Sequence, residues 1–331
     1  MPDKKNKRKN RYKRGGLMAA VDALRYRAGE YSLRGFVALL PRLPPAAVSA
    51  LTSGASGAAF RLLWRYRARM ERNLALALAE EVPSQRKRSA IVRRTWRNFA
   101  LSVLETMRWM QEPKERIAAS IAMQGEEHLK DALAKGRGVL ALSAHVGNFT
   151  MIGARVVAAG YPFSAIVKQP RDPRFAALMD EYRARVGVAT ISAKPRRDAA
   201  RAILRALRAN RVVLVVADEF KSGGVPVDFF GIPSLAPRGP ATLALRTGAA
   251  VVPMFMIRDG ADRLTLRVEP EIDLLRSGDL ESDVAENTVK FTRCLEAIIR
   301  SYPDQWNWLG FKRPDSKPRK RQARDASGTN D

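Results

Sequence analysis

The 331-residue chain contains one cysteine and two histidines, which limits the metal and redox sites it can form. Cys294 alone cannot form an internal disulfide or supply a cysteine-based metal cluster, a pattern that fits a reducing compartment. Two histidines without clustered carboxylates argue against a zinc site, since zinc takes three or four protein ligands. We therefore expect chemistry without a bound metal.

The first third of the chain lacks the apolar run of about 20 residues that a membrane-spanning helix needs. Its longest uncharged run, residues 43–60, contains two prolines and four serine or threonine residues. No apolar segment with a small-residue cleavage site follows the basic N-terminus, so no secretory signal peptide is visible. Segments 17–40 and 61–70 mix apolar residues with arginines, which is typical of helices lying on an anionic membrane. Ordinary packed helices are the alternative.

Acidic residues are scarce, because 33 Asp and Glu stand against 59 Lys and Arg and give a formal net charge of +26. Residues 1–16 carry +7 and residues 316–331 carry +3, which leaves +16 between them. We expect these two ends to be basic disordered tails. The remaining charge predicts an anionic partner, such as anionic membrane lipid or an acidic carrier protein. Tyr12 is the only aromatic residue of the tails, so no nucleic-acid partner is expected.

Three common active-site signatures are missing from the sequence. The chain has no GxxxxGK[ST] phosphate-binding loop, and no GxGxxG follows a predicted strand. It also has no GxSxG nucleophile elbow. The chemistry has to be sought in other residues.

The pattern of the sequence changes near residue 115. Residues 85–110 read as a helix with Ile91, Thr95 and Phe99 near one face. Beyond the change, β-rich runs alternate with helical ones, which predicts an α/β fold with a mixed, largely parallel sheet covered by helices. The expected strands are 138–144, 164–168, 187–192, 212–217, 225–230, 250–257 and 264–270, and the expected helices are about 148–160, 173–185, 196–209, 238–247 and 281–301. We assign residues 17–115 to a helical membrane-associated region and residues 116–315 to the α/β domain.

The stretch GVLALSAHVGNFTM, residues 138–151, puts a histidine at the end of a predicted strand. Functional groups in open α/β sheets gather at the carboxyl ends of the strands. His145 lies there, and Gly147 and Asn148 turn the chain into a helix whose N-terminus can receive an anion. Asn148 can cap that helix or donate to a substrate oxygen. The pattern indicates a general base, with a structural histidine as the alternative.

Further polar candidates follow later strands. Asp218 and Glu219 come directly after residues 212–217, where an acid can orient a base, hold a polar headgroup or simply face solvent. Arg238 lies in a stretch rich in glycine and proline, where it can meet a phosphate or an acidic carrier protein.

Several segments together resemble the bacterial lipid A biosynthesis acyltransferases, the late-acting lauroyl and myristoyl family. The segments are AHVGNF at 144–149, PVDFFGIPSLAPRGPATLALRTGAAVVP at 226–253 and QWNWLGFKRP at 305–314. RNLALAL at 72–78 is similar to a further segment of that family. The similarity of order and spacing extends from about residue 70 to residue 315.

This resemblance implies a glycerolipid-acyltransferase-like fold and a peripheral or monotopic protein on the cytoplasmic face of the inner membrane. It implies that a fatty acyl chain moves from acyl carrier protein or acyl-CoA to a hydroxyl of lipid A or a related glycolipid, without a cofactor. The family motif is a histidine followed, after four residues, by Asp or Glu. His145 matches the histidine and takes the role of general base, whereas Thr150 stands where the acid is expected.

Two further positions follow from the same resemblance. Asp218 matches an aspartate after the later strand, while Lys168-Gln169-Pro170 stands where the family favours Tyr-Arg-Pro, with Arg171 shifted by one position. The residues expected to bind substrate are Gly147, Asn148, Gln169, Arg171, Glu219 and Arg238.

The replacement of the family acid by Thr150 leaves three alternatives. A carboxylate fixes the tautomer of a catalytic imidazole and stabilises the imidazolium that forms, and threonine does neither as well. Asp218 can supply the acid, His145 can act as a weaker base, or the chain no longer catalyses. We predict acyl transfer to a glycolipid. The alternatives are another amphiphile such as a lysophospholipid, or a catalytically silent lipid-binding relative.

Overall fold

The computed structural model describes residues 31, 34–35, 38–109, 111–170, 172–220, 224–260 and 263–311. The predicted tails, 1–16 and 316–331, lie outside the described residues, as does most of the predicted membrane segment 17–40. The described helices are η2 Leu40–Arg42, α2 Pro45–Leu62, α3 Trp64–Ala77, α4 Gln85–Trp109, α5 Lys114–Ser120, α6 Glu126–Ala134, η3 Phe149–Met151, α7 Ile152–Ala158, α8 Pro173–Arg185, α9 Arg196–Arg208, α10 Gly239–Thr247, α11 Leu280–Ser301, η4 Pro303–Gln305 and η5 Trp308–Gly310.

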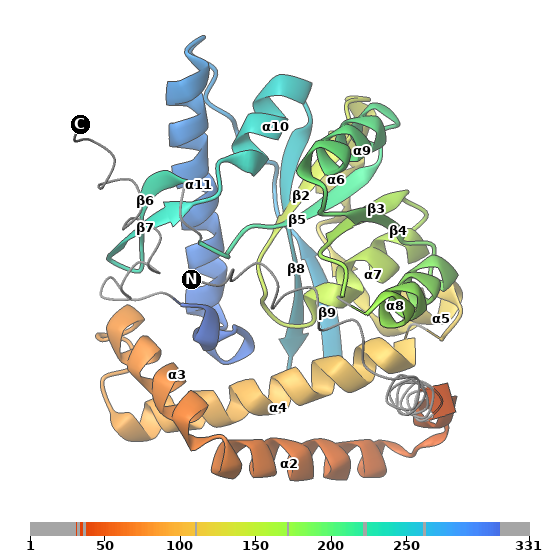
Figure 1. The fold of residues 1–331 in the computed structure, drawn as a ribbon, viewed down its shortest axis with the longest axis vertical. Helices are drawn as coiled ribbons and strands as arrows, with labels where there is room; N and C mark the ends of the chain where they lie inside the picture. The colour runs from red at the N-terminus through yellow and green to blue at the C-terminus, as the bar shows by residue number, and fades with distance from the viewer. Residues whose placement is uncertain are drawn as a thin grey trace, which may run out of the picture.

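A seven-stranded sheet forms the centre of the molecule (Figure 1). Its strands are β1 Ala122–Gln124, β2 Val139–Ser143, β3 Phe163–Val167, β4 Ala189–Ser192, β5 Val212–Val216, β8 Ala250–Asp259 and β9 Arg263–Val268, in the order β1-β9-β8-β2-β5-β3-β4. The five strands from β8 to β4 are parallel to one another, and β9 pairs antiparallel with β8. The α/β class with a mixed, mostly parallel sheet is therefore confirmed.

Both faces of the sheet are buried under helices. Leu140 and Leu142 of β2 point into a core that α9, α10 and α11 cover, and Val139 and Ala141 point into a second core under α5, α6 and α7. Successive side chains of a strand point to opposite faces, so a strand buried on both sides is apolar throughout. This burial explains why the strand-forming runs lack alternating polar residues.

Helices α2, α3 and α4 form a separate layer below the sheet, and α4 crosses under the end of β8 (Figure 1). Phe99 does not lie on the buried face with Ile91 and Thr95, because its side chain points outward and is 64% exposed. Among the described helices, none combines the length and the apolar character that a membrane crossing requires.

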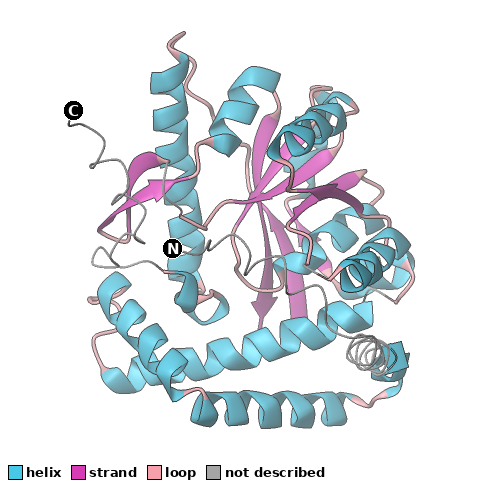
Figure 2. Cartoon of the chain, viewed as in Figure 1, coloured by secondary structure: helices cyan, strands magenta, loops and turns pink. Residues whose placement is uncertain are grey.

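The segment predicted as a strand at 225–230 forms a hairpin apart from the main sheet (Figure 2). Strand β6 Val225–Phe229 pairs antiparallel with β7 Ile232–Ala236. Phe230 and Gly231 both have positive φ, 56° and 71°, as the tight primed turns of hairpins require. Four elements, β1, β7, α5 and α6, are not among those that the sequence pattern predicts.

Candidate active site

His145 and Asp218 follow two adjacent parallel strands, which brings them to the same edge of the sheet. Ser143 at the end of β2 pairs with Val216 at the end of β5, and each candidate residue lies two positions further along its own segment. The amide of Ala217 donates to the carbonyl of Ser143 at 2.9 Å and continues the pairing past both strand ends. The ladder therefore fixes the distance between the two side chains.

The two side chains form a hydrogen-bonded pair. His145 Nδ1 lies 2.7 Å from Asp218 Oδ1, and the main-chain amide of His145 donates to Oδ2 at 2.9 Å. The carboxylate side chain is 2% exposed, whereas the imidazole is 32% exposed. If Asp218 accepts from Nδ1, the proton lies on Nδ1 and Nε2 carries the lone pair that a general base needs. The imidazole is thus positioned by a buried acid and remains accessible from solvent.

A tryptophan completes the surroundings of the carboxylate. Trp306 Nε1 donates to Asp218 Oδ2 at 2.7 Å, and Trp306 is almost fully buried. Asp218 therefore accepts hydrogen bonds from three N–H groups if Nδ1 carries the proton. A buried acceptor with this many donors cannot rotate without breaking several hydrogen bonds, so its orientation toward His145 is fixed.

The β6–β7 hairpin holds this tryptophan in place. Phe230 stacks on Trp306 with ring centroids 6.2 Å apart, and Phe229 meets the same indole edge-to-face at 6.0 Å. Trp308 and Phe311 close the cluster from the C-terminal side. The family-like segments PVDFFG and QWNWLGF therefore pack against one another, and their packing fixes a hydrogen-bond donor to Asp218.

The turn after His145 is held by main-chain contacts. Gly147 has a φ of +57°, and a Cβ on it would lie only 2.0 Å from the carbonyl oxygen of Met256. Its amide donates to Gln305 at 2.9 Å, and Val146 forms a bridge with Trp306. Glycine is required here because both the positive φ and the close approach exclude a side chain. This accounts for Gly147 without a contact to substrate.

Thr150 does not take the place of an acid beside His145. Its hydroxyl donates to Asn148 Oδ1 at 2.7 Å and lies 2.6 Å from the hydroxyl of Thr106 on α4. Asn148 is 1% exposed, and its side-chain amide donates to Glu105 at 3.1 Å. Asn148 makes no side-chain cap to the helical turn that follows it. Both residues belong to a polar cluster between the turn and α4.

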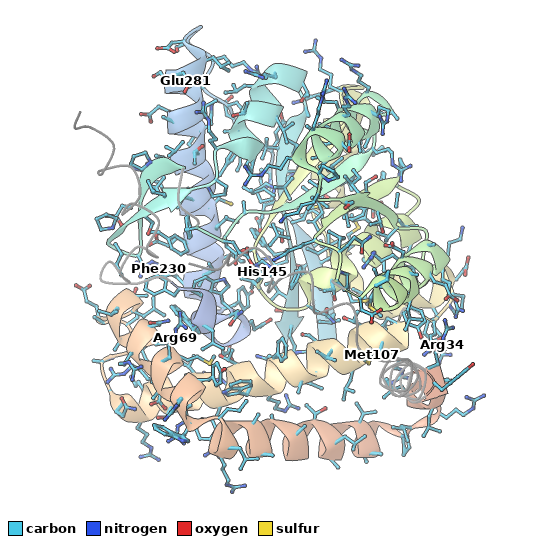
Figure 3. The ribbon with its side chains drawn as sticks, in the orientation of Figure 1. Arg34, Arg69, Met107, His145, Phe230 and Glu281 are labelled. Carbon is cyan, nitrogen blue, oxygen red and sulfur yellow. The ribbon has the colours of Figure 1, made fainter. Side chains whose placement is uncertain are left out.

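The remaining predicted substrate-binding residues are spread over the molecule. Gln169 lies just beyond β3, at the same edge of the sheet as His145, and donates to Asp180 at 2.9 Å. Glu219 is exposed next to Asp218. Arg238 pairs with Glu281 at 2.6 Å, and Figure 3 shows Glu281 toward the far end of α11 from His145. Arg171 lies outside the described residues.

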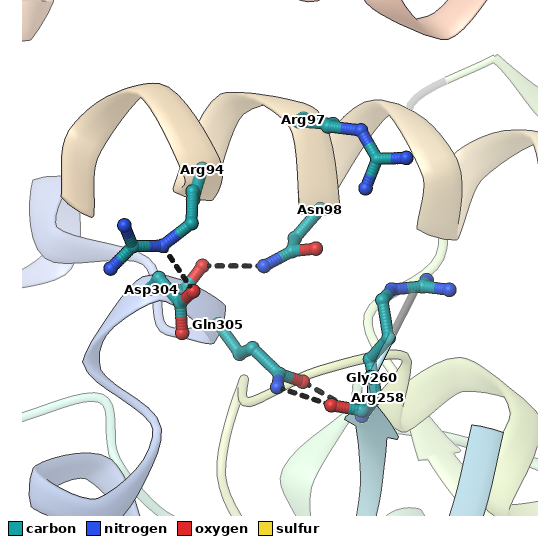
Figure 4. A pocket seen from close by; sticks show the side chains of 7 residues that line it. All are labelled: Arg94, Arg97, Asn98, Arg258, Gly260, Asp304 and Gln305. Atoms are coloured by element: carbon teal, nitrogen blue, oxygen red, sulfur yellow. Dashed lines mark hydrogen bonds and ion pairs between the residues drawn. The ribbon is translucent and has the colours of Figure 1, made fainter. Parts of the chain in front are cut away.

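A small hollow of about 110 Å³ lies between α4 and the end of β8 (Figure 4). Its lining consists of Arg94, Arg97, Asn98, Arg258, Gly260, Asp304 and Gln305. Two of these arginines are paired with carboxylates, Arg94 with Asp304 and Arg258 with Glu105. Among the described residues, no group of three or more His, Cys, Asp and Glu is arranged to hold a metal ion.

Sequence reasoning missed three residues that shape the site. Trp306 was part of a noted motif, but nothing in the sequence shows that its indole reaches Asp218. Glu105 and Arg258 form a buried ion pair at 2.6 Å beside the His145 turn, although 153 residues separate them. Only the position of Arg258 after an apolar run signals a strand end.

Comparison with known proteins gives consistent results. The family model of the bacterial lipid A biosynthesis acyltransferases matches residues 19–312. The chain is 29% identical over 275 residues to a phosphatidylinositol mannoside acyltransferase of Mycolicibacterium smegmatis, covering 81% of this chain and 87% of the relative. It is 28% identical over 294 residues to the lipid A biosynthesis lauroyltransferase of Escherichia coli, covering 86% and 92% of the two chains. A phosphatidylinositol mannoside acyltransferase of Mycobacterium tuberculosis is 30% identical over 187 residues, 56% of this chain and 57% of the relative.

Proposed function

The chain belongs to the bacterial lipid A biosynthesis acyltransferase family, and we propose that it transfers a fatty acyl chain from a thioester to a hydroxyl of a membrane glycolipid. The single observation that carries the catalytic part of the proposal is the 2.7 Å contact between His145 Nδ1 and the buried carboxylate of Asp218. This arrangement supplies an oriented base without an acid at Thr150.

The proposed reaction is a direct acyl transfer. His145 Nε2 accepts the proton of the acceptor hydroxyl while the hydroxyl oxygen attacks the thioester carbonyl carbon. The tetrahedral intermediate then collapses, the carbon–sulfur bond breaks, and the imidazolium returns its proton to the departing thiolate. Asp218 holds the imidazole tautomer and stabilises the imidazolium between these steps. The donor itself carries the activated acyl group, so no further cofactor is needed.

The net charge and the N-terminal helices support association with an anionic membrane at the cytoplasmic face. Leu62, Trp64 and Tyr66 are exposed at the junction of α2 and α3, and the Arg65 guanidinium lies over the Trp64 ring. Aromatic and apolar side chains beside arginines suit a headgroup boundary, where rings are buried and guanidinium groups meet phosphate. The same positive charge suits acyl carrier protein as the donor, with acyl-CoA as the alternative.

Two acceptors deserve a direct comparison. The lauroyltransferase relative acts in lipid A biosynthesis, and the mycobacterial relatives are acyltransferases of phosphatidylinositol mannoside. We propose lipid A or a related glycolipid as the acceptor. The second candidate is a phosphatidylinositol mannoside or a similar phosphorylated glycolipid, since the match to the M. smegmatis protein spans most of both chains. Either acceptor presents a sugar hydroxyl next to an anionic headgroup.

The histidine pair gives the test of this proposal. His145→Ala should lower the transfer of a labelled acyl chain roughly 10²–10⁴-fold, the usual contribution of a general base. His128→Ala is the matched control and should keep full activity. His128 lies on α6, before the beginning of β2, whereas His145 follows the end of that strand. Acyl carrier protein and acyl-CoA are each offered as donors, with vesicles containing either glycolipid as acceptor.

The outcomes separate the rival functions. Transfer by the unaltered chain, lost in His145→Ala and kept in His128→Ala, supports the proposal. Vesicle binding without transfer from any donor to any acceptor would identify a silent lipid-binding relative. Equal losses in the two variants would point to a structural effect and contradict the role of His145. Circular dichroism establishes in each case that the variant is folded.

A further inference from the structure

A chain of buried polar contacts joins α4 to the turn that carries His145, and the proposed reaction does not use it. The chain begins at Arg258 near the end of β8, passes through Glu105 on α4 and ends at Asn148. Figure 1 shows α4 crossing under the sheet where β8 ends. The contacts thus connect the N-terminal helical layer with the active-site turn.

The first link is a two-pronged ion pair. Arg258 Nη1 and Nη2 donate to the two Glu105 oxygens at 2.6 and 2.7 Å. The Arg258 side chain is 4% exposed and that of Glu105 is 15% exposed. A parallel guanidinium–carboxylate contact fixes both planes, so the orientation of Glu105 is set by β8 as well as by α4.

The second link reaches the turn. Asn148 Nδ2 donates to Glu105 Oε2 at 3.1 Å, and Asn148 Oδ1 accepts from Thr150 at 2.7 Å and from Thr106 at 3.0 Å. The main-chain amide of Asn148 donates to Met256 at 3.0 Å, two residues before Arg258 on the same strand. Asn148 is therefore held from both its main chain and its side chain.

The main chain of Arg258 is connected to the opposite side of the same turn. Its amide and carbonyl exchange two 2.9 Å hydrogen bonds with the Gln305 side chain, drawn in Figure 4. The Gln305 carbonyl accepts from Gly147, and the next residue, Trp306, donates to Asp218. The contacts from β8 thus reach both the turn and the acid partner of the imidazole.

We propose that Glu105, held by Arg258, is a positioning residue that sets the place of His145 through Asn148. The inference rests on the proposed role of His145 as a base. A polar link is directional in a way that apolar packing is not, because the acceptor must lie on the axis of the Asn148 N–H bond. The turn cannot shift relative to α4 without breaking this bond in a buried site.

The test cuts the link in two independent ways. Asn148→Ala removes the donor and leaves the ion pair intact. Glu105→Leu combined with Arg258→Met removes the pair together, so that no buried charge remains unpaired. Glu105→Gln with Arg258→Met is the matched rescue, because the glutamine carbonyl still accepts from Asn148. Glu271→Gln is the control for loss of a carboxylate. Glu271 pairs with Lys135, which follows α6 and lies toward the beginning of β2, whereas His145 follows the end of that strand.

The measured quantities are kcat and KM for acyl transfer and the state of the imidazole. We expect Asn148→Ala and the leucine–methionine pair to lower kcat roughly 10- to 100-fold with little change in KM, the effect of a displaced catalytic group. The glutamine–methionine pair should recover part of this loss, because it keeps an acceptor for Asn148 but lacks the Arg258 contact that orients residue 105. The proton resonance of the His145–Asp218 hydrogen bond should shift or broaden in the two impaired variants and stay in the rescued one.

Carbethoxylation of the histidines by diethyl pyrocarbonate tests positioning without any acyl transfer. The chain has only two histidines, so mass spectrometry follows both, with His128 as an internal reference. If the unaltered chain transfers no acyl group, the proposed function fails. The positioning role still stands in that case if the rate of carbethoxylation of His145 depends on the Asn148–Glu105 hydrogen bond. The positioning role is refuted if Asn148→Ala changes none of three quantities: kcat, the proton resonance of the His145–Asp218 hydrogen bond, and the rate of carbethoxylation of His145. If Asn148→Ala does not fold, the same criterion applies to the leucine–methionine pair.

Discussion

Asp218→Asn is the substitution whose effect the structure defines most completely. The carboxylate accepts the main-chain amide of His145 and the indole N–H of Trp306 at Oδ2, and its Oδ1 faces His145 Nδ1. An asparagine has one accepting oxygen and one donating nitrogen. If its oxygen keeps the two N–H donors, its nitrogen points at Nδ1 and forces the imidazole proton onto Nε2. That is the tautomer that cannot accept a proton from the acceptor hydroxyl.

The alternative orientation of the asparagine is no better. Its NH2 group would then face two N–H donors in a buried site, which leaves hydrogen-bonding groups unsatisfied at a cost of about 1–3 kcal/mol each. Either way, the positive charge formed on the imidazole loses its counter-charge. We expect kcat to fall roughly 10²–10⁴-fold, as for loss of a general base. This corresponds to about 2.7–5.4 kcal/mol of transition-state free energy.

The assay is steady-state transfer of a labelled acyl chain to a glycolipid in vesicles, with circular dichroism as the check of folding. Asp198→Asn is the matched control, because Asp198 lies on α9 with its side chain 65% exposed. Thr150→Ala should lose less than about tenfold, since its hydroxyl bonds to Asn148 and Thr106 and supplies no charge. A folded Asp218→Asn with full activity, together with a gain of activity in Thr150→Glu, would refute this reasoning.

Three further predictions follow from other contacts. Trp306→Phe removes one of the donors to Asp218 and should lower the free energy of unfolding in urea by about 1–3 kcal/mol. The loss of acyl transfer should be smaller than in Asp218→Asn, and an unchanged midpoint of the urea unfolding transition would contradict the role of the indole. Burial, with a contribution from Glu269, raises the pKa of the Cys294 thiol to about 11, so iodoacetamide at pH 8 should modify it slowly in the folded chain and quickly in urea. The chain should pellet with anionic vesicles, and high salt should weaken this binding without abolishing it; no pelleting at low salt would contradict the proposed membrane surface.

The sequence predicted the class of the fold because apolar runs of strand length alternate with amphipathic helices. Functional groups of open α/β sheets gather at the carboxyl ends of the strands, and this rule placed His145 and Asp218 at one edge of the sheet. It could not show that β5 lies next to β2. In the chain, β3 comes between these two strands, but in the sheet β3 lies on the side of β5 away from β2. The distance between the two side chains therefore required the strand order.

Two of the residues that could not be predicted, Glu105 and Trp306, act from outside the strands. Glu105 lies on α4, forty residues before His145, and helical periodicity shows which face is buried but not which strand it meets. Trp306 belongs to a recognised motif, yet its contact with Asp218 depends on the β6–β7 hairpin folding back over it. Arg238 was expected to meet an anionic ligand, and in the structure its guanidinium pairs with the exposed Glu281, a contact that the sequence does not show.

Thr150 can occupy the position of an acid because the sheet supplies the negative charge from elsewhere. A carboxylate five residues after a strand-end histidine depends on the shape of one turn. Asp218 is held by an adjacent strand, by one main-chain and one indole N–H donor, and by an aromatic cluster around that indole. The turn itself is then held by Gly147, Asn148 and Glu105 rather than by residue 150. A carboxylate at residue 150 would add a second negative charge to the cluster that Glu105 already occupies, and like charges repel. The predicted dependence on Asp218 and the predicted tolerance of threonine therefore both follow from the same strand order.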